Sequence, residues 1–186
     1  MDELELLSLV KTDPSQFSQI FKVYYKPVFG YIFRRTGDFY MAADITSEAF
    51  LKAFISIKNF SYKGISIKVW LYRIATNELN QYFRQKRKYD SLFDKVEPEE
   101  REKFSHYLSL DREELESELQ KHEQYLEVLK ALKTLKLKYQ EVIALKYFEN
   151  KSNREIAEIL DINEGTLKSL LSRGVGKLRE KCNQML

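Results

Sequence analysis

The stretch SNREIAEILDINEGTLKSLLSRG, residues 152–174, constrains the fold most, because it sets two amphipathic helices on either side of a very short corner. Ser152 followed by Glu155 fits a capping box, in which the two side chains satisfy free N–H groups at the start of a helix. Asn163 can cap the second helix in a similar way. Since only about three residues separate the helices, we expect a steep crossing of the helix-turn-helix type.

The second of these helices combines an apolar inner face with a polar outer face. We expect Leu167 inside, together with Leu170 or Leu171, and small Ala157 where the first helix approaches closely. The outward positions are Glu164, Thr166, Lys168, Ser169, Ser172, Arg173 and Lys177. Hydroxyls mixed with Lys and Arg can meet base edges and phosphates in the major groove. The pattern predicts a helix that reads duplex DNA, with an ordinary solvated face as the alternative.

The segments around this motif complete a small helical domain. Upstream, LKTLKLKYQEVIALKYFEN supplies apolar positions for two further packing helices. Downstream, Gly174 and Gly176 each lower helix stability by roughly 1 kcal/mol relative to Ala. We therefore expect the second helix of the motif to end or loosen near Arg173.

Charge divides the chain into three segments. Residues 1–89 carry a net charge of +6, residues 90–124 a net charge of −7, and residues 125–186 a net charge of +4. Basic segments favour polyanions, and an acidic connector is repelled by them. With six Gly and three Pro, the chain is predicted to be all-α. We expect two small helical domains, residues 1–88 and 125–186, joined by an acidic linker over residues 89–124.

Several classes of protein are disfavoured. No window approaches the roughly 18 apolar residues of a membrane span, and the acidic start MDELELLSLV does not fit a signal peptide. A single Cys182 fits a reducing cytoplasm, and His106 and His122 have no Cys partner for a zinc site. No Gly-rich phosphate loop or nucleophile–base pairing is found. We expect a cytoplasmic protein without enzymatic activity, metal or cofactor, and without membrane insertion.

The N-terminal segment reads as an aromatic-rich helical domain. Residues 17–31 trace an apolar helical face that Pro27 interrupts, so a kink or a break is expected there. The next helix, GDFYMAADITSEAFLKAF, buries its small and apolar residues and presents Asp44 and Glu48 one turn apart. These two acids indicate either a protein-docking face or solvated surface charges.

A polar stripe runs along the third helix of this domain. Its members recur at steps of four and three residues and include no acid: Arg73, Asn77, Asn80, Arg84 and Arg87. Arg suits phosphates and Asn suits base edges, so the stripe predicts a nucleic-acid face. The loop before it, KNFSYKGISIK, interleaves Phe60 and Tyr62 with lysines. Such aromatics can stack on an unpaired base, unless they pack back onto the core.

Taken together, the runs AADITSEAFLKAF, WLYRIATN, EVIALKYFENKSNREIAEIL and EGTLKSLLSRGVGKL resemble the sigma-70 family of bacterial transcription initiation factors. They are most similar to its small two-domain extracytoplasmic-function group. The resemblance implies that the factor binds core RNA polymerase, directs it to promoter DNA and helps to melt the minus-ten element. It also implies an anti-sigma factor as a partner.

The resemblance assigns roles to particular residues. Core polymerase contact through the clamp helices of the largest subunit falls to Asp44, Glu48 and Leu51, and the flap is a further polymerase contact. Contact with single-stranded minus-ten DNA is assigned to Phe60, Ser61, Tyr62, Lys63, Arg73, Asn77, Asn80, Gln81, Arg84 and Arg87. The outward positions of the C-terminal helix, from Glu164 to Lys177, would read the minus-thirty-five element.

Two alternatives remain open at this point. A helix-turn-helix regulator with no role in polymerase specificity would share the C-terminal motif but would lack the aromatic loop and the Arg/Asn stripe. A helical adaptor that only sequesters a regulator would not need the two polar faces.

Overall fold

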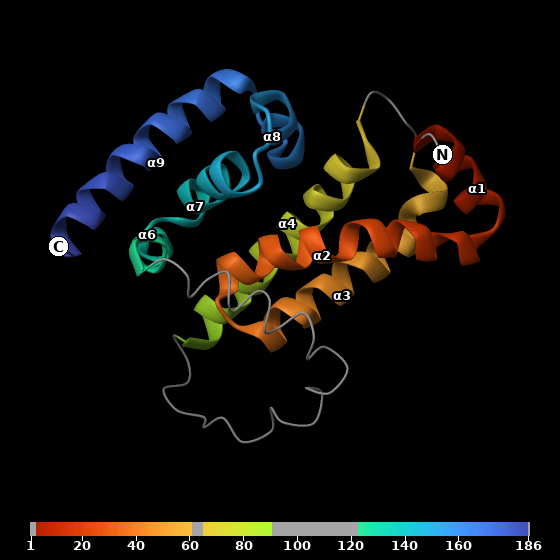
Figure 1. Cartoon of the computed structure of the whole chain (residues 1–186), viewed down its shortest axis with the longest axis horizontal. Coiled ribbons are helices and arrows are strands. Elements are labelled where there is room, and N and C mark those ends of the chain that lie inside the picture. The colour runs from red at the N-terminus through yellow and green to blue at the C-terminus, as the bar shows by residue number, and fades with distance from the viewer. Residues whose placement is uncertain (1–2, 61–64, 91–122, 186) are drawn as a thin grey trace.

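The computed structural model describes residues 3–60, 65–90 and 123–185. Within this part of the chain every regular element is a helix, which confirms the all-α prediction. Figure 1 shows two groups of helices: α1 to α4 form one, and α6 to α9 lie along one side of it.

The first group begins with α1 (Glu3–Thr12) and a short 3-10 turn, η1 (Pro14–Gln16). Three long helices follow: α2 (Phe17–Thr36), α3 (Phe39–Ser56) and α4 (Ile67–Asp90), with the 3-10 turn η2 (Ile57–Asn59) after α3. Gly37 ends α2 in the left-handed conformation, at φ 66°, which glycine adopts without the strain of a Cβ. Asp38 then caps α3 by accepting a hydrogen bond from the backbone N–H of Met41 at 3.1 Å.

Two features of this group go beyond the sequence prediction. Of the kink or break expected at Pro27, the break is excluded, because helix α2 runs unbroken through this residue. Helix α1 was not foreseen, although Leu7 and Val10 are buried at a helical spacing. The Glu3 carboxylate accepts a hydrogen bond from the backbone N–H of Ile67 and so satisfies a free donor in the first turn of α4.

The second group consists of α6 (Glu123–Thr134), α7 (Leu137–Ile143), a π-helical turn η4 (Ala144–Phe148), α8 (Asn153–Leu160) and α9 (Glu164–Met185). Its core contains the expected upstream residues, including Leu132, Val142 and Leu145, all at most 3% exposed. Of the acidic linker, residues 91–122 lie outside the described residues.

Helix α9 does not end near Arg173. It continues to Met185 through both glycines, which corrects the expectation from helix propensity. A Cβ at Gly174 would lie 3.2 Å from Ile143 Cδ1 and 3.3 Å from Tyr139 Cδ1. The glycine therefore lets α9 approach α7 closely, and this packing offsets its low helix propensity.

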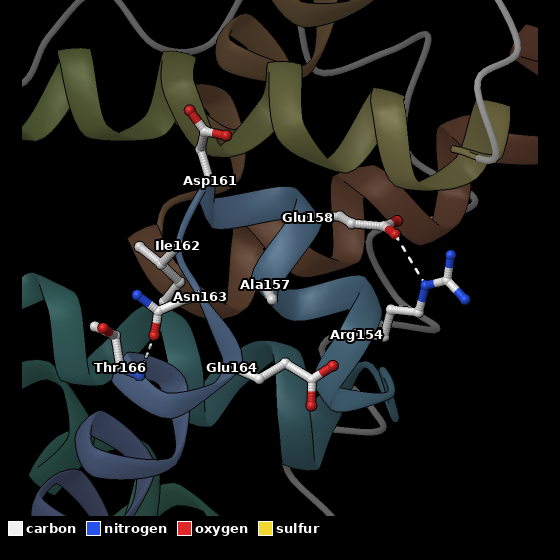
Figure 2. Close-up of a pocket in the computed structure, with 8 residues that line it drawn as sticks. All are labelled: Arg154, Ala157, Glu158, Asp161, Ile162, Asn163, Glu164 and Thr166. Carbon is white, nitrogen blue, oxygen red and sulfur yellow. Dashed lines mark hydrogen bonds and ion pairs between the residues drawn. The ribbon is translucent and has the colours of Figure 1, made fainter.

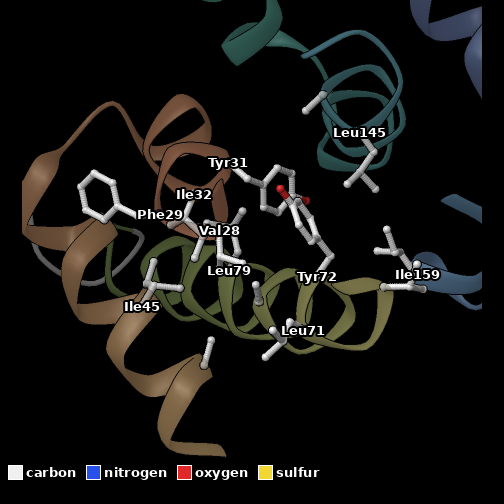
Figure 3. Close-up of a cluster of buried hydrophobic side chains, with 14 of the residues drawn as sticks. Val28, Phe29, Tyr31, Ile32, Ile45, Leu71, Tyr72, Leu79, Leu145 and Ile159 are labelled. Carbon is white, nitrogen blue, oxygen red and sulfur yellow. The ribbon is translucent and has the colours of Figure 1, made fainter. Parts of the chain in front are cut away.

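The two groups share one apolar cluster. Figure 3 shows Tyr31 and Tyr72 from α2 and α4 together with Leu145 and Ile159 from the C-terminal helices. Tyr31 and Tyr72 are at most 1% exposed, and their ring centroids lie 5.4 Å apart. Fully burying a side chain such as Leu145 or Ile159 contributes about 1.5–3 kcal/mol. The expectation of two separate domains gave no sign of this contact.

Candidate nucleic-acid interface

The corner between α8 and α9 forms as the sequence predicts. The Ser152 hydroxyl accepts from the backbone N–H of Glu155 at 3.2 Å, and the Glu155 carboxylate accepts from the backbone N–H of Ser152 at 2.8 Å. Asn163 caps α9 by accepting from the backbone N–H of Thr166 at 2.7 Å, which Figure 2 shows at the open hollow of this corner. Asp161 ends α8 at φ 55°, in the left-handed conformation. These caps confirm the capping predictions and fix the direction in which α9 leaves the corner.

Helix α9 presents its polar face to solvent. Leu167 is fully buried, whereas Leu170 and Leu171 are half-buried against the core. The outward set is exposed at every position: Glu164, Thr166, Lys168, Ser169, Ser172, Arg173 and Lys177. The face is therefore accessible along its length, as reading of a groove requires.

The acidic positions on α3 are also accessible. Asp44 and Glu48 are exposed, and Leu51 is 53% exposed. Beside them lie two apolar side chains that sequence reasoning missed, Phe54 at 42% and Ile55 at 67% exposure. Apolar residues at i, i+3 and i+4 that do not enter the core would have been the signal for them. Together they form a mixed acidic and apolar face, the kind of surface that marks protein interaction sites.

A lysine bridges this face to α4. The Lys52 ammonium lies 3.4 Å from Glu48 and 2.5 Å from Glu78, which is on α4. The hydrogen bond with Glu78 is the main reason that the pKa of Lys52 is raised. The bridge ties the mixed acidic and apolar face of α3 to the helix that carries the polar stripe.

The polar stripe on α4 is divided by its environment. Its members Asn77 and Arg84 are exposed, as is neighbouring Gln81, whereas Arg73 and Asn80 are half-buried. Arg73 pairs with Asp161 of the helix-turn-helix corner at 2.8 Å. The side chain of Asn80 hydrogen-bonds to Glu141 on α7. Part of the stripe therefore faces the C-terminal helices.

The loop before α4 is described at its two ends, up to Phe60 and from Ile65 onward. Phe60 is buried and its ring lies against Trp70, with the centroids 4.6 Å apart. Of the two alternatives for Phe60, the structure shows packing back onto the core, because Trp70 supplies an apolar partner. Ser61, Tyr62 and Lys63 lie outside the described residues, and so does the side chain of Arg87 on α4.

A buried polar cluster between the two groups of helices was not foreseen. The Glu149 carboxylate, 7% exposed, accepts from the Arg34 guanidinium and from the Tyr72 hydroxyl, the latter at 2.7 Å. The Lys151 ammonium lies 4.0 Å from the centroid of the Tyr72 ring. The one sequence signal for this cluster is that Lys151 directly precedes the capping box. That position does not indicate which residues Lys151 would contact.

This cluster shifts several pKa values. Burial, and then the Glu149 charge, raise the pKa of the Tyr72 hydroxyl. Burial, followed by the charge of Lys68, lowers the pKa of Lys151 to about 8. On α7, burial raises the pKa of Glu141, although Arg35, Asn80 and Arg84 oppose this. These groups hold charge or polarity at the interface between the two groups of helices.

In the described part of the chain, no group of three or more His, Cys, Asp or Glu side chains could hold a metal ion. None of the described helices has the length and apolar character needed to cross a bilayer.

The fold and its faces define a helical DNA-binding protein with a helix-turn-helix in its second half. The protein-family model for sigma-70 region 2 matches residues 20–89, and the family model for sigma-70 region 4 matches residues 125–178. The chain is 33% identical over 177 residues to the ECF RNA polymerase sigma factor SigW of Bacillus subtilis, covering 94% of this chain and 93% of SigW. It is also 27% identical to SigM of the same organism, covering 89% of this chain and 94% of SigM.

Solved structures of other proteins share the fold. CnrH, in complex with the cytosolic domain of CnrY, matches with a TM-score of 0.67 at 18% identity, over 98% of this chain and 97% of CnrH. The sigma factor RpoE of Bartonella quintana, in complex with the anti-sigma factor NepR, matches with a TM-score of 0.63 at 21% identity, over 90% and 96%. The chain belongs to the sigma-70 family, in its extracytoplasmic-function group. It is a transcription initiation factor that binds RNA polymerase and promoter DNA.

Proposed function

We propose that the factor divides its work between two domains, residues 1–88 and 125–186. The first docks on core polymerase and opens the minus-ten element, and the second reads the minus-thirty-five element as duplex. The observation that carries this proposal is the pair of accessible polar faces: Asn77, Gln81 and Arg84 on α4, and the outward set on α9. Both faces carry cationic side chains that can bind DNA phosphates, together with side chains that can hydrogen-bond base edges.

Melting follows from a difference in affinity between states. Side chains that bind unpaired bases stabilise the open complex and leave the duplex unaffected, which shifts the population toward open DNA. Asn77 and Gln81, one turn apart and exposed, suit this role, with Arg84 on the neighbouring backbone. Ser61, Tyr62 and Lys63 are proposed to complete the base pocket with Phe60, Arg73, Asn80 and Arg87. Phe60 would have to leave Trp70 to stack on a base.

Polymerase docking is assigned to the mixed face on α3. Asp44, Glu48 and Leu51, together with exposed Phe54 and Ile55, combine negative charge with apolar area. Such a surface fits the clamp helices of the largest polymerase subunit if these present basic and apolar side chains. The C-terminal domain would rest on the flap.

Further assignments concern partners and place of action. Both structural neighbours described above are complexes: CnrH with the cytosolic domain of CnrY, and RpoE with the anti-sigma factor NepR. This supports an anti-sigma factor for the present chain. A polymerase subunit acts where the chromosome is, so we place the factor in the cytoplasm, and we assign it no catalytic reaction of its own.

The test is reconstituted transcription. The purified full chain, added to bacterial core polymerase on fragmented genomic DNA of the source organism, should yield transcripts with defined 5′ ends. Sequencing those ends would give the promoter elements. Transcripts that begin at random positions, at the level of core polymerase alone, would contradict the proposal. The double variant Asp44→Ala/Glu48→Ala should lose transcription together with retention on immobilised core polymerase.

A further inference from the structure

Two acids of the C-terminal helices lie against the polar stripe of α4. Asp161, at the helix-turn-helix corner, pairs with Arg73 at 2.8 Å. Glu141, on α7, accepts a hydrogen bond from Asn80 and interacts electrostatically with Arg84. We infer that the structure is a closed, self-inhibited conformation of the factor, in which acids of the C-terminal domain occupy part of the minus-ten face. The inference rests on the proposed function for the identity of that face.

The acids are suited to take the place of DNA. A carboxylate uses the same guanidinium donors as a phosphate, so Arg73 cannot serve both at once. The amide of Asn80 is likewise engaged by Glu141 and cannot reach a base edge. Access to this part of the stripe therefore requires that α7 and α8 move away from α4.

Glu149 is the anchor of the closed form. Its side chain is 7% exposed and joins Arg34 of α2 to Tyr72 of α4, so one carboxylate connects three elements. The local backbone conformation positions the Glu149 side chain. The N–H of Glu149 bonds to the carbonyl of Ala144 at 3.1 Å, and Asn150 follows in the left-handed conformation at φ 49°. Charge-assisted hydrogen bonds to a buried carboxylate are much stronger than an exposed ion pair.

The Asp161–Arg73 ion pair is weaker than the contacts of Glu149. It matters because it occupies a residue of the polar stripe. The Asp161 side chain is 82% exposed and that of Arg73 is 34% exposed, so water screens the pair. Position 161 is left-handed, where glycine is the residue of lowest strain. Aspartate tolerates this conformation and adds a carboxylate directly over the stripe.

Other contacts indicate that the closed form is reversible. Among the described residues, no hydrogen-bond partner is found for Nε and one terminal nitrogen of buried Arg35, or for Oδ1 of Asn80. Unpaired buried polar atoms carry a desolvation cost that water would remove on opening. The burial that lowers the pKa of Lys151 adds a similar cost. The linker of about 35 residues can span at most about 115–125 Å, which leaves the domains free to separate.

The inference is tested by a distance measurement without DNA or polymerase. Spin labels are attached to Lys11→Cys and Lys181→Cys in the full chain carrying Cys182→Ser, and the label–label distance is measured by pulsed electron paramagnetic resonance. Both lysines are exposed and lie on α1 and α9, in different domains. The wild-type background should give a narrow distribution, as one closed arrangement requires.

Matched variants then probe the anchor. Glu149→Gln keeps the shape and removes the charge, and should raise the open-to-closed ratio about tenfold or more, seen as a broad population at longer distance. Asp161→Asn should raise it less than about threefold. Glu158→Gln removes an equal charge on α8 whose ion-pair partner, Arg154, is on the same helix, so it should change nothing. Circular dichroism would show that each variant retains its helix content. A broad wild-type distribution, or an unchanged Glu149→Gln distribution, would overturn the inference.

A second measurement tests the masking of the DNA face. Binding of a fluorescein-labelled single-stranded 20-mer of mixed sequence is followed by anisotropy for the same variants. Glu149→Gln should bind several times more tightly than wild type, while Glu158→Gln, with the same change in net charge, should not. Opening without a gain in affinity would overturn the masking and leave the closed arrangement itself intact. Transcription by the wild type tests the proposed function separately.

Discussion

The Lys151 ammonium lies 4.0 Å from the centre of the Tyr72 ring, and so a cation of the C-terminal domain packs on an aromatic face of the N-terminal one. Lys151 is 3% exposed. The charged groups around it are Lys68 on α4, which disfavours its charge, and Glu149 and Glu155, which favour it. Burial is the largest influence, so the neutral amine is favoured relative to water.

Stability should therefore rise with pH on the alkaline side of neutrality. The pKa of Lys151 is about 8 in the fold and ordinarily 10.5, so between these values the unfolded chain binds more protons and the free energy of unfolding increases with pH. Relative to Lys151→Met, wild type should gain about 1–2 kcal/mol between roughly pH 7.5 and 9.5, measured by urea unfolding. Above about pH 10 the buried Tyr72, whose pKa is raised, reverses the trend. Exposed Lys181→Met is the control, and a difference from Lys151→Met that does not vary with pH would contradict the prediction.

The two glycines of α9 should respond differently to alanine. A Cβ at Gly176 meets nothing within 4 Å, so Gly176→Ala should stabilise the protein by about 0.5–1 kcal/mol through helix propensity. A Cβ at Gly174 would crowd Ile143 and Tyr139, so Gly174→Ala should gain less or lose stability. Thermal unfolding of the two variants side by side gives the comparison. Equal stabilisation at both positions would contradict the prediction, because it would show that α7 shifts to accommodate the added methyl group without loss of stability.

Removal of the capping box should weaken α8. Ser152→Ala deletes the acceptor for the backbone N–H of Glu155 and should cost about 1 kcal/mol, measured by urea unfolding. Ser152→Thr keeps the oxygen and should cost much less. If Ser152→Thr were as destabilising as Ser152→Ala, loss of the cap could not be the cause.

The helices and their caps could be predicted from sequence because their causes are local. Ser152, Glu155 and Asn163 satisfy backbone groups within three residues, and the apolar spacing around Leu167 reports one face of one helix. The outward positions of α9 follow from the same periodicity. The continuity of α9 could not be predicted, because it depends on the packing of Gly174 against Tyr139, far back in the sequence.

The contact between domains was hidden for a similar reason. Glu149 and Arg34 are 115 residues apart, and the residues next to each in the sequence do not indicate that the two would be in contact. The spacing of the Arg/Asn stripe predicts one continuous face, whereas Arg73 and Asn80 contact acids of the C-terminal helices and Asn77 is exposed to solvent. Local patterns predict which side of a helix is polar. What that side meets depends on how the domains pack.

The proposed division of labour between the two DNA faces predicts that variants of the two faces respond differently to the template. Arg173→Ala removes a phosphate or base donor from α9 and should weaken the closed promoter complex, by about 1–3 kcal/mol if it contacts a base, on duplex templates with a minus-thirty-five element. Asn77→Ala should instead slow opening on duplex DNA, and on a pre-melted bubble, where no opening is required, the defect should be much smaller. Run-off transcription by the reconstituted holoenzyme on both templates separates the two. Lys181→Ala, exposed on α9 beyond the outward set, should behave as wild type. Since Asn77 is assigned to the melting step, an equal loss on duplex and bubble for Asn77→Ala would remove it from that step.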